Sequence, residues 1–211
     1  MTWIALAYHL ASRLAYVLYV GLTLKRQDRT AHLTRRHGAE AGFGRFRRVA
    51  AFVMANDAVS FGVLCLVSAN TLHLGLPRGL TIAVGAVLAL VGVATKIWAA
   101  ATLGDGYYWH NFFTTADRIV PKAAGPYRWL RNPMYTVGYL PVYGLALATS
   151  SVFGLVAALF DQSAILTFYH MVEKPHFERR RQPPPPSAPV VRSAPGSARP
   201  PSLDTAPGQP P

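Results

Sequence analysis

The chain has 211 residues, and its composition differs from that of a water-soluble domain. Apolar residues make up 51% of it and charged residues only 14%, whereas soluble domains carry roughly 25% charged residues. The formal net charge of +12 is concentrated beside the apolar segments, which argues against a nucleic-acid partner and for a membrane surface.

The apolar residues form blocks close to the roughly 20 residues that a helix needs to cross a bilayer. We therefore predict an all-α, polytopic membrane protein whose last two helices form a hairpin. The five predicted spans are residues 3–24, 50–76, 80–103, 134–149 and 152–172. The first block has no basic residues ahead of it and no clear cleavage site, so it is predicted to be a retained span rather than a signal peptide.

The hairpin between the last two spans is predicted to reverse at Thr149, Ser150 and Ser151. Hydroxyl side chains end helices by bonding their own backbone, and nothing else interrupts this apolar run. The fourth span is therefore expected to be short.

Basic residues predict the orientation of the chain in the membrane. The link between spans two and three holds only Arg78. The link between spans one and two holds Lys25, Arg26, Arg29, Arg35, Arg36, Arg45, Arg47 and Arg48. Because Lys and Arg accumulate in cytoplasmic loops, we expect an outside amino terminus and a cytoplasmic carboxyl terminus. The basic loops should lie close to the anionic membrane lipids of the inner leaflet.

Four residues that are charged at neutral pH lie inside the predicted spans, where a charge at the bilayer centre costs roughly 2.5 to 3.5 kcal/mol on insertion scales. Arg13 and Asp161 lie about ten residues from the outer ends of their helices, and Asp57 and Lys96 about seven from the inner ends. Equal depth predicts two buried ion pairs, Arg13 with Asp161 and Asp57 with Lys96. Such pairs either join helices or form an ion path, and we favour the structural role.

The last segment, residues 183–211, consists mainly of Pro, Ala, Ser, Gly and Arg and contains no aromatic residue. It cannot bury enough surface to offset the entropy of ordering, so we predict that it is disordered. The preceding residues 1–182 form the predicted membrane domain. Cys65 is the single cysteine, and no cysteine or histidine pair has zinc spacing, so no metal is expected.

The segments that flank the last two spans carry residues suited to chemistry. One reads Leu-Gly-Asp-Gly-Tyr-Tyr-Trp-His-Asn-Phe-Phe from Leu103, and the next reads Gly-Pro-Tyr-Arg-Trp-Leu-Arg-Asn-Pro-Met-Tyr from Gly125. Val-Glu-Lys-Pro-His-Phe-Glu-Arg-Arg follows the fifth span. Because the spans form a hairpin, Arg131 and Tyr135 at its start and Glu173 at its end should return to the same membrane face.

This combination resembles the isoprenylcysteine carboxyl methyltransferases and phospholipid methyltransferases, over roughly residues 103–180. The mark of that family is Gly-x-Tyr-x-x-x-Arg-His-Pro-x-Tyr, a helical hairpin and then Glu-Glu. The matching positions are Gly125, Tyr127, Arg131, Pro133, Tyr135 and Glu173. The resemblance implies an S-adenosylmethionine site at the cytoplasmic face, and Gly104 and Gly106 would be the Gly-x-Gly of the phospholipid branch. A turn after span three would use the same two glycines for backbone freedom.

The resemblance implies a role for each matching residue. Glu173 would bind the ammonium or ribose of the methyl donor, and Arg131 its carboxylate by a forked contact. Pro133 would fix the turn that begins span four, and Tyr135 would shape the pocket. His110 is the candidate catalytic base if the acceptor is an amine, which must lose a proton; the alternative for His110 is a headgroup contact.

Three departures from the family pattern stand out. Asn132 occupies the position where the family usually has His; it can still donate and accept hydrogen bonds in the cofactor site, but it cannot titrate. Lys174 replaces the second glutamate. The family's Gly-x-x-Tyr-x-x-Tyr continuation is replaced by Gln182 and four prolines. The tail is therefore predicted to be either a lineage-specific extension or the product of a shifted reading frame.

The predicted function is S-adenosylmethionine-dependent methyl transfer to a lipid or lipophilic acceptor. The acceptor is either a phospholipid amine or an isoprenylcysteine carboxylate, and the Gly-x-Gly pair favours the amine. Two alternatives stay open. The first is a membrane reductase of sterol-like substrates that uses NADPH and shares the hairpin architecture, and the second is a non-catalytic membrane scaffold. The sequence gives no indication of an oligomeric state.

Overall fold

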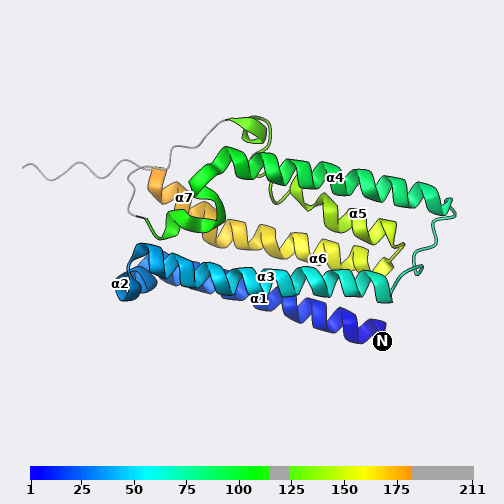
Figure 1. The fold of residues 1–211 in the computed structure, drawn as a ribbon, viewed down its shortest axis with the longest axis horizontal. Coiled ribbons are helices and arrows are strands. Elements are labelled where there is room, and N and C mark those ends of the chain that lie inside the picture. The colour runs from blue at the N-terminus through cyan, green and yellow to red at the C-terminus, as the bar shows by residue number, and fades with distance from the viewer. Residues whose placement is uncertain (115–123, 182–211) are drawn as a thin grey trace, which may run out of the picture.

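The computed structural model of the chain describes residues 1–114 and 124–181, and the regular elements in these residues are all helices (Figure 1). In chain order they are α1 (Thr2–Thr30), α2 (His32–His37), α3 (Ala39–Val67), α4 (Arg78–Leu103), η1 (Gly104–Phe112), η2 (Gly125–Arg128), η3 (Val137–Tyr139), α5 (Leu140–Ala148), α6 (Val152–Phe168), η4 (Tyr169–Glu173) and α7 (Lys174–Arg181). The predicted disordered tail, residues 183–211, lies outside the described residues.

Four helices are long and apolar enough to cross a membrane: Thr2–Thr30, Ala39–Val67, Arg78–Leu103 and Val152–Arg180. The last of them runs from α6 through the π-helical turn η4 into α7. A shorter apolar helix, Val137–Ala148, lies between the third and the fourth. Its length is about 18 Å at 1.5 Å per residue, less than the roughly 30 Å of a hydrocarbon core. The chain is an integral membrane protein with four long candidate spans, and the predicted fourth span, 134–149, is this short helix.

The predicted second span, 50–76, has different bounds in the structure. Its helix, α3, begins at Ala39 and ends at Val67. Two backbone N–H groups of the following link donate hydrogen bonds to the turn between α5 and α6, from Asn70 to the Thr149 carbonyl (3.0 Å) and from Leu72 to that of Ser150 (2.8 Å). These bonds replace helical ones, so the residues after Val67 form a turn and an irregular link instead of continuing the helix. The apolar pattern shows where a segment is hydrophobic but not which backbone bonds it makes.

The reversal between α5 and α6 occurs at the three hydroxyl residues that follow Ala148. Ser151 is the N-cap of α6, and its hydroxyl accepts a hydrogen bond from the Gly154 N–H at 2.7 Å. Ser150 has a positive φ of 51°, which turns the chain sharply. The Ser151 hydroxyl also lies 2.6 Å from that of Ser68, so the same residue joins the hairpin to the end of α3.

Four of the helices form two pairs, and α6 joins the pairs. α4 packs along α5, α1 packs along α3, and α6 contacts α1, α3 and α5 (Figure 1). Two glycines allow the first pair to approach closely: a Cβ at Gly85 would lie 2.5 Å from the Gly144 carbonyl oxygen and 2.9 Å from the Ala148 nitrogen. Because no side chain separates the backbones there, α4 and α5 form a unit.

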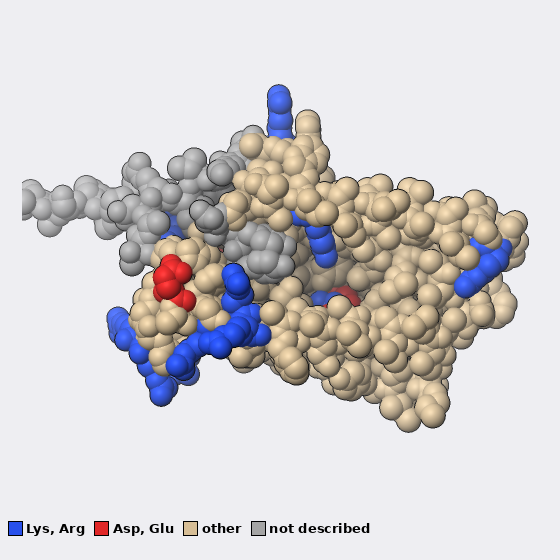
Figure 2. All heavy atoms as spheres, in the orientation of Figure 1, with Lys and Arg blue, Asp and Glu red and all other residues tan. Residues whose placement is uncertain are grey.

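The buried apolar residues form two clusters, and a polar cluster lies between them along the helices. One cluster includes Leu24 and Phe46, and the other includes Leu64 and Ala157. Basic side chains gather at the end of the bundle that carries α2 (Figure 2). We name this the basic end; its arginines on α1, α2 and α3 are Arg26, Arg29, Arg35, Arg36, Arg45, Arg47 and Arg48. The predicted orientation, which places these residues in the cytoplasm, stays a prediction.

Candidate functional site

The candidate site is centred on Glu173, a buried carboxylate at the last residue of η4. The Tyr135 hydroxyl donates a hydrogen bond to Glu173 Oε1 at 2.8 Å, and the Trp109 indole N–H donates to the same oxygen. Tyr135 lies just before α5 and Trp109 in η1, so three segments distant in sequence meet at one carboxylate. The hairpin brings Tyr135 and Glu173 together, and the short π-helical turn, a feature frequent at functional sites, carries the acid.

Tyr127 lies near enough to Glu173 for an electrostatic interaction between the two side chains. Burial in the first place, and the Glu173 carboxylate in the second, raise the pKa of the Tyr127 hydroxyl to about 12. The hydroxyl therefore stays protonated, and able to donate a hydrogen bond, at any pH near neutrality. Four of the aromatic and acidic groups, namely Tyr127, Tyr135, Trp109 and Glu173, thus belong to one neighbourhood, which we name the Glu173 site.

The segment before α5 is held by Asn132 and Pro133. Asn132 Oδ1 accepts a hydrogen bond from the Tyr135 N–H at 3.2 Å, and the Asn132 carbonyl accepts one from the Thr136 N–H at 3.1 Å. Pro133 is fully buried. The amide nitrogen Nδ2 of Asn132 is also buried, and among the described residues it has no hydrogen-bond partner. Asn132 thus fixes the turn with its oxygen, while its Nδ2 is a donor that no described residue uses.

Other predicted site residues lie at the edge of this neighbourhood or outside it. Arg131 is exposed. His110 Nε2 lies 3.4 Å from Glu40 Oε1, and its ring centre lies 4.7 Å from that of Phe43, so His110 contacts α3. Gly104 ends α4 with a positive φ of 56°, and a Cβ there would meet no atom within 4 Å.

The remaining two predicted glycines differ from Gly104. Gly106 lies within η1, the segment that carries Trp109. Gly125 has a φ of 57°, and a Cβ there would lie 3.1 Å from Trp98 Nε1 and would also collide with Thr102. Gly125 therefore allows η2 to pack against α4.

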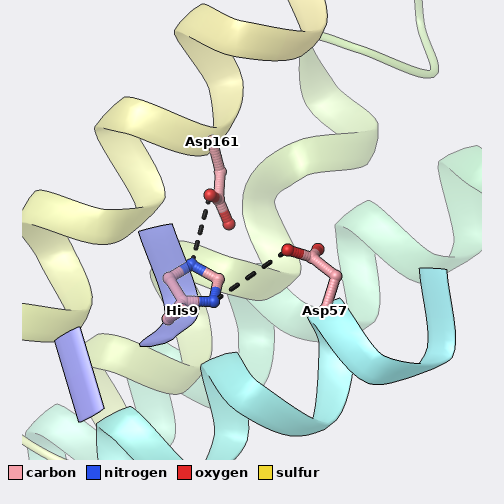
Figure 3. A group of neighbouring side chains, drawn as sticks. All are labelled: His9, Asp57 and Asp161. Carbon is pink, nitrogen blue, oxygen red and sulfur yellow. Dashed lines mark hydrogen bonds and ion pairs between the residues drawn. The ribbon is translucent and has the colours of Figure 1, made fainter. Parts of the chain in front are cut away.

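A second polar cluster is buried between the apolar clusters. Arg13 NH2 lies 2.7 Å from Asp57 Oδ2 and 2.7 Å from Asp161 Oδ2. His9 lies between the same two acids (Figure 3), with Nε2 3.2 Å from Asp161 Oδ1 and Nδ1 2.9 Å from the Ser60 hydroxyl. We name His9, Arg13, Asp57 and Asp161 the Arg13 cluster; α1, α3 and α6 supply its members.

The Arg13 cluster confirms one of the two predicted ion pairs and shows that the other is wrong. Arg13 pairs with Asp161 as predicted. Asp57 does not pair with Lys96, because its carboxylate is bound by Arg13 as well. The Lys96 ammonium instead lies 5.2 Å from the centre of the Tyr139 ring, whose hydroxyl accepts a hydrogen bond from Arg13. One arginine thus serves both acids.

His9 was not predicted to be a member of this cluster. A signal was present, because His9 and Arg13 are four residues apart and so lie on one face of α1. The ligand atoms of His9, Asp57 and Asp161 lie within 4.8 Å of one another, a spacing that a metal ion can bridge. The guanidinium of Arg13 already neutralises the two carboxylates and would repel a cation, so the cluster is best described as a link between three helices.

Comparison with known proteins finds sequences similar to a large part of the chain. Residues 80–180 match the phospholipid methyltransferase family. A phosphatidylethanolamine N-methyltransferase of Clavispora lusitaniae is 31% identical over 148 residues, which are 64% of this chain and 17% of that protein. The enzyme of the same name from Candida tropicalis is 29% identical over 147 residues, 64% of this chain and 16% of that protein.

A third relative, the phosphatidylethanolamine N-methyltransferase of Malassezia globosa, is 30% identical over 140 residues, 64% of this chain and 14% of that protein. The chain thus spans about one sixth of the length of the curated relatives it matches. No solved structure matches it. The family match runs from α4 to α7 and includes every residue of the Glu173 site. Residues 80–180 of the chain are therefore similar to the phospholipid methyltransferase family.

Proposed function

We propose that the chain transfers a methyl group from S-adenosylmethionine to the amine of a phospholipid, and that the Glu173 site binds the methyl donor. The observation that carries this proposal is the buried Glu173 carboxylate, held by Tyr135 and Trp109 inside the segment that matches the family. Burial of a charged carboxylate costs free energy unless another group compensates the charge. A cationic ligand would compensate the charge of Glu173.

The residues of the site fit the chemistry of this donor. S-adenosylmethionine has a cationic sulfonium and an ammonium, which suit the Glu173 carboxylate. It also has a carboxylate and ribose hydroxyls, which suit the exposed Arg131 and the Asn132 Nδ2, a donor without a partner among the described residues. The open space beside Gly104 allows a ligand to approach the backbone. This fit supports the predicted cofactor residues as one site.

When bound, S-adenosylmethionine supplies an electrophilic methyl group. The lone pair of the amine forms the new N–C bond as the S–C bond breaks, and one proton leaves the nitrogen. Alignment and exclusion of water should provide most of the rate, so few catalytic groups are needed. We propose His110 as the group that accepts the proton, because Glu40 at 3.4 Å can orient its imidazole.

The acceptor and the membrane face are part of the proposal. The relatives named above are phosphatidylethanolamine N-methyltransferases, which favours a lipid amine over an isoprenylcysteine carboxylate. The same match favours methyl transfer over reduction of a sterol-like double bond. The basic end, which carries the Glu173 site, is proposed to face the cytoplasm, where the donor is soluble.

The test is binding of labelled S-adenosylmethionine to the purified protein in nanodiscs. Glu173→Gln keeps the size of the side chain but removes its charge, and we expect it to weaken donor binding by a factor on the order of ten or more, about 1.4 kcal/mol per factor of ten. The matched control is Glu178→Gln, which changes an exposed acid on α7 that pairs with Lys174 at 3.8 Å. The control should bind the donor as the unchanged protein does.

Equal donor affinity in Glu173→Gln and in the control would refute the assignment of Glu173. Absence of donor binding by the unchanged protein would refute the methyltransferase proposal. In that case binding of NADPH would support the reductase, and binding of neither compound would support the scaffold.

A further inference from the structure

Lys96 lies inside α4, seven residues before its end, and has no counter-ion among the described residues. Among the residues that the structure describes, no carboxylate lies within ion-pair distance of its ammonium, because Arg13 binds both nearby acids. A charged side chain inside a membrane span costs free energy and usually marks a functional position. Lys96 therefore requires an anion that the described part of the chain does not provide.

The side chain of Lys96 is held in place rather than free to reach the membrane surface. Its stem crosses Gly138, where an added Cβ would lie 2.9 Å from Lys96 Cγ. Its ammonium lies 5.2 Å from the centre of the Tyr139 ring, and the hydrogen bond from Arg13 to the hydroxyl of Tyr139 fixes that ring. Lysines near helix ends extend toward water, whereas Lys96 lies seven residues, about 10 Å, before the end of α4.

The bundle is open on the side between α3 and α4. α4 packs along α5, whereas α3 packs along α1 and α2. Figure 2 shows the surface hollowed between α3 and α4, with basic and acidic atoms at the bottom of the hollow. Outward-facing side chains on both helices, such as Val59 and Val93, are apolar and exposed. A lipid in the bilayer can therefore reach charged groups without crossing a helix.

We propose that Lys96 binds the phosphate of a phospholipid headgroup in this hollow and so positions the acceptor; the proposal rests on the function proposed above. Lysine binds phosphate as a compact point charge. Tyr139 lies under Lys96, and Tyr135, four residues earlier, bonds Glu173, so the short segment 135–139 connects the two sites. A phosphate bound at Lys96 leaves the amine of the same headgroup free to extend toward the Glu173 site.

A phospholipid fits this arrangement better than an isoprenylcysteine does. The carboxylate of an isoprenylcysteine is itself the methyl acceptor, so it must lie at the donor and not at a separate cation. A phospholipid has its anion and its nucleophile on different atoms of the headgroup. The separation of Lys96 from Glu173 therefore selects an acceptor with both groups.

The first experiment measures binding of labelled phosphatidic acid, which has the phosphate but no amine, to the protein in mixed micelles. We expect Lys96→Met to weaken this binding on the order of tenfold and Lys96→Arg to retain most of it. Lys25→Met is the control, because it removes a lysine at the basic end outside the hollow. Neutral diacylglycerol should bind all four proteins equally weakly.

Donor binding is measured in the same samples, so that the two proposals fail separately. Lys96→Met should leave the affinity for S-adenosylmethionine unchanged; a loss of donor binding with lipid binding intact would mean that Lys96 holds the donor carboxylate, which overturns the proposal. Competition by millimolar inorganic phosphate as effective as that by lipid would also overturn it, as would equal lipid binding by Lys96→Met and Lys25→Met.

Folding of the variants provides a further check. Removal of an uncompensated charge from a span should keep or raise the midpoint of thermal unfolding. If Lys96→Met does not fold, Lys96→Gln keeps a polar side chain of similar length and tests the same loss of charge. Lipid binding by Lys96→Gln at the unchanged level would overturn the proposal, while absence of donor binding by the unchanged protein refutes only the proposed function.

Discussion

Arg13 controls the charge balance inside the bundle. It lies 2.7 Å from the carboxylates of both Asp57 and Asp161, and all three side chains are buried. Arg13→Met would leave two acids close together without a cation, and breaking a buried ion pair costs roughly 3 to 5 kcal/mol. We expect the midpoint of thermal unfolding, measured in detergent, to fall on the order of 10 °C.

A double variant distinguishes charge imbalance from lost packing. Arg13→Met combined with Asp161→Asn removes one acid together with the base, so the loss should be smaller than the sum of the two single losses. The exposed Arg45 supplies the matched control, since Arg45→Met should change the midpoint by less than a degree or two. Strict additivity of the two single effects would show that the Arg13 charge is not the cause.

Residue identities predict the depth of a charged group in a membrane but not its neighbours. Counting along the helices places Asp57 and Lys96 at equal depth, yet Asp57 faces Arg13 and Lys96 faces Tyr139. The direction in which a side chain points depends on the rotation of each helix about its axis, which a single sequence leaves undetermined. The Arg13 and Asp161 pair was predictable because few other charges lie near that depth.

At the scale of elements, the contact between α4 and α5 depends on glycine. A Cβ at Gly85 would lie 2.5 Å from the Gly144 carbonyl oxygen, and the backbone there cannot move without separating the helices. We therefore expect Gly85→Ala to lower the midpoint of thermal unfolding by several degrees. This loss should occur although alanine stabilises a helix by about 1 kcal/mol relative to glycine. The measurement is thermal unfolding followed by circular dichroism.

Gly62→Ala is the matched control for this prediction. Gly62 also lies within a long helix, α3, but a Cβ there would meet no atom within 4 Å. It should keep or slightly raise the midpoint, because only the helix propensity changes. If both variants have the same midpoint, close backbone packing does not hold α4 to α5.

The elements of the Glu173 site differ in how far the sequence predicts them. The apolar hairpin places Tyr135 and Glu173 at one end of the bundle, and the structure joins them at 2.8 Å. Trp109 was not identified, because η1 has no helical period that would indicate its direction, and Trp109 itself has an unusual positive φ of 65°. Irregular segments are determined by tertiary contacts, so single-sequence patterns describe them poorly.

At the scale of the whole molecule, the succession of helices was predictable and their arrangement was not. The length of the apolar segments predicts the long helices, and the hydroxyl residues predict the reversal of the chain before Val152. The central position of α6, which joins the α4 and α5 pair to the α1 and α3 pair, follows from contacts between helix faces. Those faces carry small and apolar residues on several sides, so their pairing is not encoded in any one helix.

The asymmetric charge of the whole molecule predicts its orientation. Arginines gather at the basic end, whereas at the opposite end the link between α3 and α4, residues 68–77, carries none and is followed by the single Arg78. Translocation of Lys and Arg is disfavoured, so the basic end should face the cytoplasm. Single cysteines test this, introduced as Ala41→Cys at the basic end and Leu74→Cys in the link, in a background that carries Cys65→Ala.

A membrane-impermeant maleimide applied to intact cells should label the Leu74→Cys protein at once and the Ala41→Cys protein only after permeabilisation. Both positions are exposed in the structure, so a difference in labelling reports the side of the membrane rather than burial. The reverse pattern would place the basic end outside. The Glu173 site would then face away from the cytoplasmic pool of the methyl donor, and the proposed reaction would lose its source of methyl groups.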